Sequence, residues 1–293
     1  MERLSDIGTI RDILSRHGFR FSKAMGQNFL VNPTVCPRMA AASGADSSCG
    51  VLEIGPGIGV LTVELARVAQ KVVAVELDQR LMPVLAETLA HCPNAKVVQG
   101  DIMAVDLPRL LQEEFGGMPV HVCANLPYYI TSPVLMRLLE ERLPIQSITV
   151  MVQKEAADRI CALPGTREAG AVSVAVRYYA EPELLFRVSR GSFMPAPQVD
   201  SAVIRLRVRP APGVETADER LFFALVKASF GQRRKTMLNA VSAGLGVSKE
   251  ALAAWMDQCG LPLQARAEQM TMTQFAALAN RIAAGRKEDT NGQ

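Results

Sequence analysis

Short apolar runs alternate with helical patterns between about residues 51 and 163. Continuous runs of Val, Ile and Leu predict buried strands at 51–54, 71–76, 95–100, 120–125 and 147–153. Apolar residues at helical spacing follow each run and predict helices that begin near residues 61, 81, 107, 133 and 154. Because strands and helices alternate at this spacing, we predict βαβ units and a mostly parallel sheet with helices on both faces.

Two more strands are predicted after this alternation, at residues 171–179 and 201–209, with a Pro-rich loop between them. Such a pair would join the sheet as an antiparallel addition and bring it to seven strands. Arg205, Arg207 and Arg209 alternate with apolar residues in the second strand, so they share one face. We interpret this face as a solvated edge, which arginines also protect from aggregation.

A linker is predicted at 209–220, where two Pro, one Gly and many polar residues come together. The sequence after it shows only helical patterns, at 221–230, 234–245, 249–260 and 272–285. The predicted fold class is therefore α/β, with a Rossmann-like domain at 46–210 and a small all-helical domain at 211–293.

Composition narrows the class of protein. The 293 residues are 49% hydrophobic, so the chain can bury a substantial core. No apolar run approaches the roughly 18 residues of a transmembrane helix, and the first ten residues do not resemble a signal peptide. The six cysteines form no C-x-x-C pair and the three histidines do not cluster, so we expect reduced thiols and no metal site. These features predict a cytoplasmic protein with no membrane partner.

Charge is unevenly distributed along the chain, although the net charge is only +3. Acidic residues outnumber basic ones between residues 39 and 120, whereas the segments on either side are net positive. Arginine dominates the basic residues, and its planar guanidinium binds two phosphate oxygens at once. The pattern is consistent with a polyanionic partner, and a GC-rich genome would explain the arginine excess equally well.

A glycine-rich loop follows the first predicted strand. Gly55, Gly57 and Gly59 come directly after Glu53 and before a helix, where a ligand can touch the backbone at the helix N-terminus. The dinucleotide fingerprint would require a third glycine at position 60, which is Val60. The spacing instead resembles motif I of methyltransferases that use S-adenosylmethionine (SAM). A site for another nucleotide and a purely structural turn remain alternatives.

Two acidic residues end the next two predicted strands. Glu76 is placed to accept hydrogen bonds from both ribose hydroxyls of a nucleoside, and Asp101 to accept one from an adenine amino group. Either acid alone is more often a helix N-cap. Together with the glycine loop they would occupy one crevice at the carboxyl ends of the strands, where open α/β sheets bind ligands.

The segment Asn125-Leu126-Pro127-Tyr128-Tyr129 follows the fourth predicted strand. It resembles the [D/N/S]-P-P-[Y/F/W] motif of enzymes that methylate the exocyclic amines of bases. The amide oxygen of Asn125 and the carbonyl of Leu126 can each accept a hydrogen bond from an adenine amine and aim its lone pair at the methyl donor. Pro127 would fix the loop, and Tyr128 would offer its ring to a base pulled from its stack.

Three further segments carry a resemblance to one family. They are Lys23-Ala24-Met25-Gly26-Gln27-Asn28-Phe29-Leu30, Phe193-Met194-Pro195-Ala196-Pro197-Gln198-Val199-Asp200-Ser201 and Phe230-Gly231-Gln232-Arg233-Arg234-Lys235-Thr236-Met237-Leu238-Asn239. Together with the glycine loop and the Asn-Leu-Pro-Tyr segment, they resemble in order the motifs of the rRNA adenine N6-dimethyltransferases. The third segment is similar to the ribosome-biogenesis branch that acts on the bacterial small subunit.

The resemblance implies a SAM pocket without a metal. Its walls would be Gln27, Asn28, Leu30, Gly55, Gly57, Glu76, Asp101 and Asn125, with residues 1–45 forming an arm and helices that complete it. Phe193 would face Tyr128 across the target base, beside Asn125, Leu126 and Pro127. The implied reaction is SAM-dependent dimethylation of two adjacent adenosines in a hairpin loop near the 3′ end of 16S rRNA, in the small ribosomal subunit or its precursor.

The C-terminal region is implied to bind rRNA, and the chain is expected to be a monomer with a role in subunit biogenesis. Arg233, Arg234 and Lys235 are placed at the start of a predicted helix, where cations oppose the helix dipole, so phosphate contact is favoured over a solvated face. Three alternatives are a methyltransferase acting on large-subunit rRNA, a DNA adenine methyltransferase, and a ribosome-binding assembly factor that needs no catalysis.

Overall fold

The computed structural model describes residues 4–19 and 28–291. Contacts divide the chain into two compact units. The first unit comprises Met1–Ala157 and Glu181–Val208, and the second comprises Asp158–Ala180 and Arg209–Gln293. The segment 158–180 is thus grouped with the C-terminal residues, whereas the sequence placed it in a domain that ends at residue 210.

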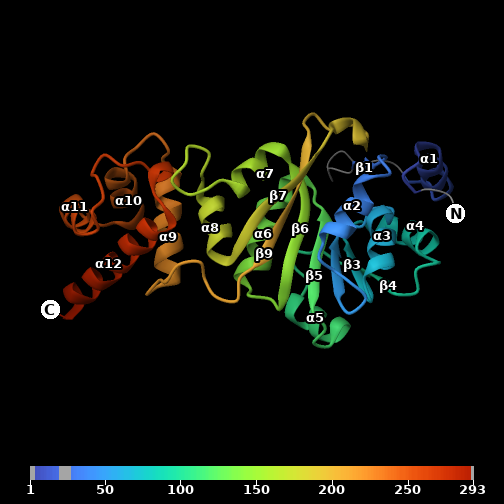
Figure 1. The fold of residues 1–293 in the computed structure, drawn as a ribbon, viewed down its shortest axis with the longest axis horizontal. Helices are drawn as coiled ribbons and strands as arrows, with labels where there is room; N and C mark the ends of the chain where they lie inside the picture. Colours follow the sequence, from blue (N-terminus) through green and yellow to red (C-terminus); the bar gives the residue numbers. More distant parts are fainter. Residues whose placement is uncertain (1–3, 20–27, 292–293) are drawn as a thin grey trace. The chain divides into compact units, whose positions relative to one another are not determined.

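A seven-stranded sheet forms the centre of the first unit (Figure 1). Its strands are β2 Gly50–Ile54, β3 Lys71–Glu76, β4 Ala95–Gln99, β5 Val120–Asn125, β6 Ile145–Gln153, β7 Ala180–Val188 and β9 Ser201–Val208. The order is β4-β3-β2-β5-β6-β9-β7, in which β2 to β6 are parallel and β9 is antiparallel to β6. The predicted α/β fold class with a mixed seven-stranded sheet is confirmed.

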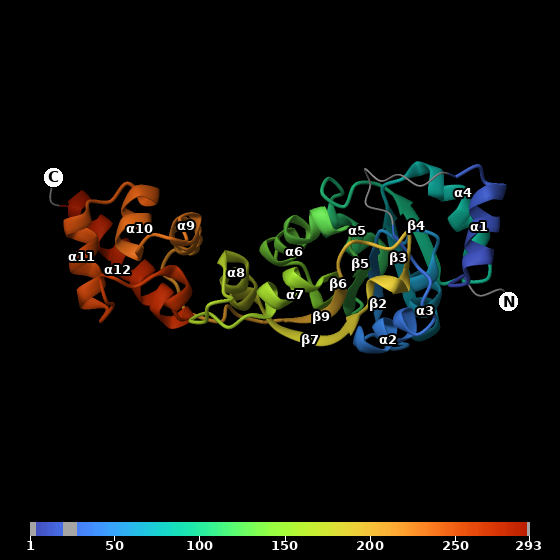
Figure 2. The ribbon, with the colours of Figure 1, turned by 90° about the horizontal axis from the view of Figure 1, so that it is seen from above.

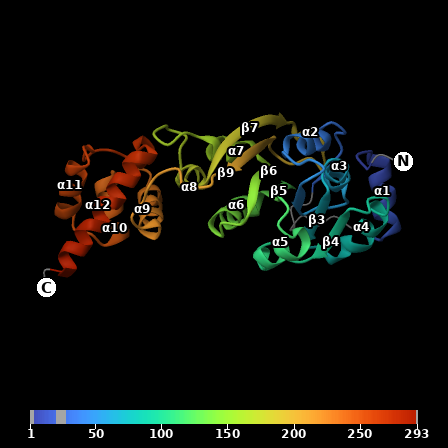
Figure 3. The ribbon, with the colours of Figure 1, turned by 60° about the horizontal axis from the view of Figure 1, so that its bottom comes forward.

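Helices cover both faces of this sheet, as the buried Val, Ile and Leu runs require. Helices α2 and α3 lie on one face, and α5 and α6 lie on the other (Figures 2 and 3). The helices of this unit are α1 Ile7–Arg16, α2 Val35–Ala42, α3 Val60–Val68, α4 Met82–Thr88, α5 Leu107–Phe115, α6 Thr131–Glu140 and the start of α7 Lys154–Cys161. Leu61 and Leu65 of α3 pack with Val51 and Val72 of the sheet in one core cluster.

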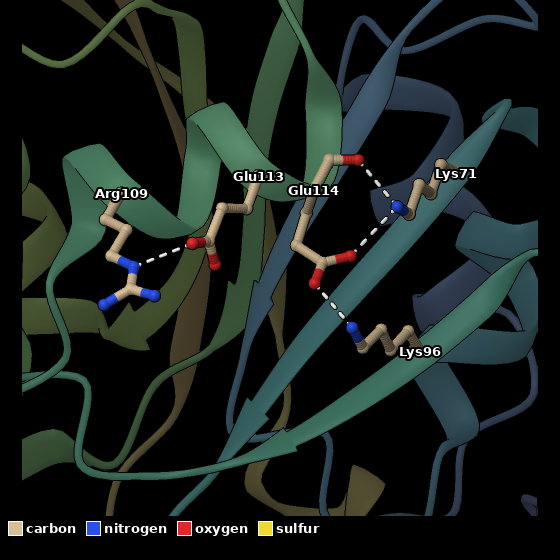
Figure 4. Close-up of polar contacts among 5 residues, drawn as sticks. All are labelled: Lys71, Lys96, Arg109, Glu113 and Glu114. Atoms are coloured by element: carbon tan, nitrogen blue, oxygen red, sulfur yellow. Dashed lines mark hydrogen bonds and ion pairs between the residues drawn. The ribbon is translucent and has the colours of Figure 1, made fainter.

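Ion pairs attach α5 to the edge of the sheet (Figure 4). Glu114, whose side chain is 12% exposed, accepts from Lys71 of β3 at 2.9 Å and from Lys96 of β4 at 2.5 Å. The two ammonium groups lower the pKa of the Glu114 carboxyl. Arg109 and Glu113 form a second pair at 2.7 Å on the same helix, one turn apart and more exposed. This pairing holds the end of α5 against β3 and β4, the strands that lead to the two candidate acids.

The strand predicted at 171–179 is wrong. These residues form helix α8 Ala171–Tyr179, and the strand of this region is β7 Ala180–Val188, which the sequence analysis missed. The Ser173 hydroxyl accepts from the N–H of Gly170 at 3.0 Å and donates to the Arg159 carbonyl at 2.6 Å, which caps α8 and anchors its first turn. Burial on several sides of this helix outweighs the strand preference of its Val and Tyr residues.

The arginines of β9 are ion-paired. Arg205 and Arg207 both donate to Glu183 of β7, at 2.8 and 2.9 Å. The side chains share one face as the alternation predicts, but β9 lies between β6 and β7, so the expected edge position is wrong. The neighbouring strand supplies a carboxylate for two of them, so this face is less available to an outside anion than a row of unpaired arginines would be.

The C-terminal part of the second unit is helical. Its helices are α9 Glu219–Gly231, α10 Met237–Leu245, α11 Lys249–Gln258 and α12 Met272–Asn291. Side chains of Asp218, Thr236 and Ser248 cap the first three of these helices, which explains where they begin. The hydroxyls of Tyr178 and Tyr179 both donate to Glu219, at 3.2 and 2.7 Å, which links α8 to α9 inside this unit.

Candidate active site

A pocket opens at the carboxyl ends of the central strands of the first unit. Eleven of the residues that the sequence analysis selected line it: Asn28, Leu30, Gly55, Gly57, Glu76, Asp101, Asn125, Leu126, Pro127, Tyr128 and Phe193. They come from the ends of β2, β3, β4 and β5 and from two strand segments outside the main sheet. The geometry therefore brings both groups, the expected cofactor residues and the expected target residues, to one place.

The backbone of the glycine-rich loop adopts positive φ angles, which favour glycine. Gly57 has φ of 61° and Gly59 has φ of 89°, both in the left-handed region that favours glycine. A Cβ on Gly59 would also lie 3.0 Å from Leu89. Gly55 also has a positive φ, of 67°, but apart from its two chain neighbours no described atom lies within 4 Å of where its Cβ would be. The loop is thus shaped by packing at its far end and leaves open space in front of Gly55.

The two acids differ in their surroundings. Glu76 is 5% exposed and accepts hydrogen bonds from the backbone N–H of Gly57 at 3.2 Å and of Asp78 at 2.7 Å. Burial raises the pKa of Glu76, and the two backbone donors oppose part of that rise. Asp101 is exposed and accepts from the N–H of Met103 at 2.8 Å. Glu76 is therefore held rigidly, whereas Asp101 begins a surface turn.

Glu53 also lines the pocket, although it was not predicted as a site residue from the sequence. Its side chain is 1% exposed, and Oε2 has no hydrogen-bond partner among the described residues. Burial raises the pKa of Glu53 to about 8, with Thr62 opposing and Glu76 adding to the rise. The sequence signal is an acid within an otherwise apolar strand, which the glycine motif by itself does not single out. A buried carboxyl of this kind favours a cationic ligand group.

The Asn125 loop leaves β5 and turns at once. The N–H of Leu126 donates to the carbonyl of Met151 at 3.2 Å, and a 3₁₀ turn follows at Tyr128–Ile130. The Tyr128 hydroxyl lies 2.7 Å from the Ser201 hydroxyl, which fixes the ring at the pocket. Within the described part of the chain, no hydrogen bond engages the side-chain amide of Asn125 or the carbonyl of Leu126. Both acceptors are thus free to meet a ligand.

A small second sheet joins two motifs that are far apart in the chain. Strand β1 Phe29–Leu30 pairs antiparallel with β8 Phe193–Met194, with Leu30 opposite Phe193. The carbonyl of Ser192 accepts from the N–H of Val31 at 2.8 Å, and its hydroxyl accepts from the Asn32 amide at 3.1 Å. This pairing explains how Leu30 and Phe193 reach the same pocket.

Three exposed apolar side chains surround the pocket and were not selected from the sequence. Leu77 is 49% exposed, Met103 is 40% exposed and Tyr129 is 60% exposed, and all three line it. Leu77 and Met103 follow the two acids, so their positions could have been found from the strand ends. Tyr129 was visible only as the residue that follows the Asn-Leu-Pro-Tyr segment.

Three selected residues lie elsewhere, and a fourth, Gln27, is outside the described residues. Arg233, Arg234 and Lys235 belong to the second unit, where they are exposed. They occupy the turn between α9 and α10 and precede the N-cap Thr236, so the expected position at the start of a helix is corrected to the connection before it. Arg233 reaches the carbonyls of Arg167 and Ala169 at 3.5 and 3.4 Å.

Metal ligands do not gather in the described part of the chain. No three His, Cys, Asp or Glu side chains in the ranges 4–19 and 28–291 come together as a metal site would require. In the same ranges, every helix is too short or too polar to cross a bilayer.

Comparison with known proteins places this chain in a family. The profile "Ribosomal RNA adenine dimethylase" matches residues 18–284. "Ribosomal RNA small subunit methyltransferase A" of Geobacillus thermodenitrificans is 46% identical over 94% of this chain and 95% of its own length. The protein of the same name from Shouchella clausii is 47% identical over 92% of both chains.

Solved structures of two methyltransferases share the fold of this chain. The 23S rRNA methyltransferase ErmE superposes with a TM-score of 0.67 at 29% identity, over 87% of this chain and all of its own. A dimethyladenosine transferase from Plasmodium falciparum shares the fold with a TM-score of 0.70 at 24% identity, over 85% of this chain and 95% of its own. The family expected from the five motifs is confirmed, and the chain belongs to the ribosomal RNA adenine dimethylase family.

Proposed function

We propose that this protein transfers methyl groups from SAM to the N6 atoms of two adjacent adenosines, in a hairpin loop near the 3′ end of 16S rRNA. The observation that carries the proposal is the single pocket in which Glu76 and the glycine loop lie together with Asn125. Relatives named as small-subunit methyltransferases match nearly the full chain, which favours the small subunit or its precursor as the partner. A role in subunit biogenesis in the cytoplasm follows from that substrate.

The cofactor end of the pocket suits SAM in charge and shape. SAM carries a sulfonium and an ammonium group, and the unpartnered buried Oε2 of Glu53 is the kind of group that a cation would satisfy. Glu76 would hold the ribose hydroxyls, and Asp101 the adenine amine. Gly55 leaves the space that the methionine part needs, and Gly57, Asn28 and Leu30 line the same pocket. Gln27, which is outside the described residues, would contribute as the family resemblance implies. When bound, the cofactor supplies an electrophilic methyl group.

The target end presents acceptors for one amine and rings for one base. The Asn125 amide oxygen and the Leu126 carbonyl would each accept one N–H of adenine N6, so the nitrogen lone pair points at the methyl group. Pro127 would keep the two acceptors at a fixed spacing. Tyr128 and Phe193 would enclose the base, which must leave its stack to enter the pocket. The proton released on transfer passes to solvent.

The second unit would supply most of the rRNA contact. Arg234 and Lys235 are exposed in the turn between α9 and α10, and Arg233 beside them is partly engaged by carbonyls. Three cations in one exposed turn fit the phosphate backbone, which dominates the affinity of proteins for nucleic acid.

Labelled SAM separates this proposal from its competitors. The purified protein is incubated with undermethylated small subunits, with large subunits and with adenine-containing DNA, and nucleosides are analysed for dimethyladenosine. Label in small-subunit rRNA alone is expected. Label in large-subunit rRNA would favour the activity named for ErmE, which shares 29% identity with this chain. Binding to small subunits without any transfer would favour an assembly factor.

A further inference from the structure

We propose that Tyr129 is a positioning residue that stacks on the nucleobase next to the one being methylated. The proposal rests on the proposed function and names how the same site recognises two adjacent adenosines. Tyr129 would act at the mouth of the pocket, whereas Tyr128 and Phe193 would enclose the target base inside it.

Tyr129 differs from the three other tyrosines of the chain. Tyr178 and Tyr179 are buried and donate to Glu219, and the Tyr128 hydroxyl meets Ser201. Tyr129 is 60% exposed, and within the described ranges its hydroxyl and its ring have neither a hydrogen bond nor a ring contact. Neither packing nor a polar bond in this part of the chain accounts for its large ring.

The position of Tyr129 suits a second base. It lines the same pocket as Asn125 and follows Tyr128 directly in a 3₁₀ turn. Tyr128 and Tyr129 thus offer two aromatic rings to two successive bases, one inside the pocket and one, on the more exposed residue, at its mouth.

The chemistry favours a base over other occupants. An exposed tyrosine ring offers a flat apolar face with a polar tip, and base–aromatic stacking needs no fixed hydrogen-bond pattern. When one of two adjacent adenosines enters the pocket, the other loses its stacking partner and must find a new one. Tyr129 supplies that partner in either order of methylation.

A double-mutant cycle on the protein and the RNA tests this contact. Small subunits are assembled on rRNA that carries a synthetic hairpin, in which the adenosine beside the target is either intact or abasic. KM and kcat of the first methyl transfer are measured for wild type, Tyr129→Ala and Tyr129→Phe, together with SAM affinity. Leu163→Ala, which removes a side chain that is 59% exposed in the second unit, is the matched control.

Tyr129→Ala should raise KM on intact RNA about five- to hundredfold, the range expected when one base–aromatic stack is removed, with kcat and SAM affinity little changed. Tyr129→Phe and Leu163→Ala should behave as wild type. On abasic RNA the Tyr129→Ala change should have no further effect. An equal loss on both RNAs, an unchanged KM or a weakened SAM affinity would overturn the proposal.

The experiment also distinguishes a wrong proposed function from a wrong stacking contact. If wild type transfers no methyl group to these particles, the function proposed above is wrong. For the same protein variants and RNAs, the affinity for the particles is then measured in the presence of S-adenosylhomocysteine. A base-dependent loss of binding in Tyr129→Ala would still support the stacking contact, and a base-independent result would reject it.

Discussion

The backbone N–H of Gly57 donates a hydrogen bond of 3.2 Å to Oε2 of Glu76. The bond ties the loop after β2 to the end of β3, so the two parts of the proposed cofactor site are oriented by one carboxylate. The Asp78 N–H holds the other oxygen at 2.7 Å. Glu76 therefore arrives at the pocket with its position fixed and with lone pairs left for a ligand.

The first prediction concerns this carboxylate. Glu76→Ala should weaken SAM binding about ten- to hundredfold, because charge-assisted hydrogen bonds contribute roughly 1.5–3 kcal/mol. Calorimetric titration with SAM measures the effect, and circular dichroism checks the fold. Asp106→Ala is the matched control, since Asp106 is also an acid between strand and helix but caps α5 outside the pocket. Unchanged SAM affinity in Glu76→Ala would refute the assignment.

The second prediction follows from the raised pKa of Glu53, about 8 because of burial. The native protein holds this proton at pH values where the unfolded chain has lost it, so the native state binds more protons. The free energy of unfolding should then fall as the pH rises between about 4.5 and 8, by about 1.4 kcal/mol per pH unit from this group. Above that range the contribution levels off.

Urea unfolding of the ligand-free protein at a series of pH values tests this slope. Glu53→Gln keeps the size of the side chain and cannot ionise, so the difference between the two proteins isolates Glu53. A difference that does not vary with pH would show that Glu53 titrates normally. Saturating SAM should reduce the slope of wild type if the carboxylate form meets a cation in the complex.

The third prediction concerns Asn125. Asn125→Ala should lower turnover on the order of 10²–10³-fold, by analogy with the loss of one preorganised oxyanion-hole donor, and leave particle binding nearly intact. The residual product should be enriched in monomethyladenosine, because a once-methylated amine has one N–H left and relies on the Leu126 carbonyl. Single-turnover assays with nucleoside analysis decide the point. Near-normal dimethylation by this variant would reject the proposed mechanism.

The fourth prediction concerns the basic turn of the second unit. Arg234→Ala with Lys235→Ala should weaken particle binding and flatten its logarithmic salt dependence, by roughly 0.7–0.9 units for each phosphate that is no longer neutralised. SAM affinity should not change. The control removes two other exposed cations of the same unit, Arg220 and Lys249. Equal slopes for the two double variants would show that the turn has no special role.

The elements that the sequence predicted well share one property, namely that their local pattern and their tertiary environment agree. Four of the five parallel strands, β2, β3, β5 and β6, are mostly buried, so their apolar runs show directly in the sequence, as at 120–125. Helix α5 carries an N-cap at Asp106, a Pro in its first turn and Gly116 after its end, and it begins at Leu107 as predicted.

The predictions from sequence were wrong where the local sequence pattern and the tertiary environment disagree. Residues 171–179 are rich in Val and Tyr yet form a helix, because their surroundings bury Val174, Val176 and Tyr178 together. Residues 180–188 form a strand although they include two acids and a Pro, which suits an edge of the sheet. In the site, Glu53 and Tyr129 were missed because their importance lies in burial and exposure, and neither property can be read from a motif.

The pairing of β1 with β8 has a consequence for biosynthesis. All five parallel strands are complete once residue 153 has emerged from the ribosome, but the pocket still lacks Phe193 and the partner of Leu30. At about 5–20 residues per second, the N-terminal arm waits on the order of ten seconds for that partner. Nascent chains stalled with residue 188 exposed should therefore bind SAM more weakly than chains stalled with residue 215 exposed. A protein that we propose modifies ribosomes would complete its own active site only late in its translation.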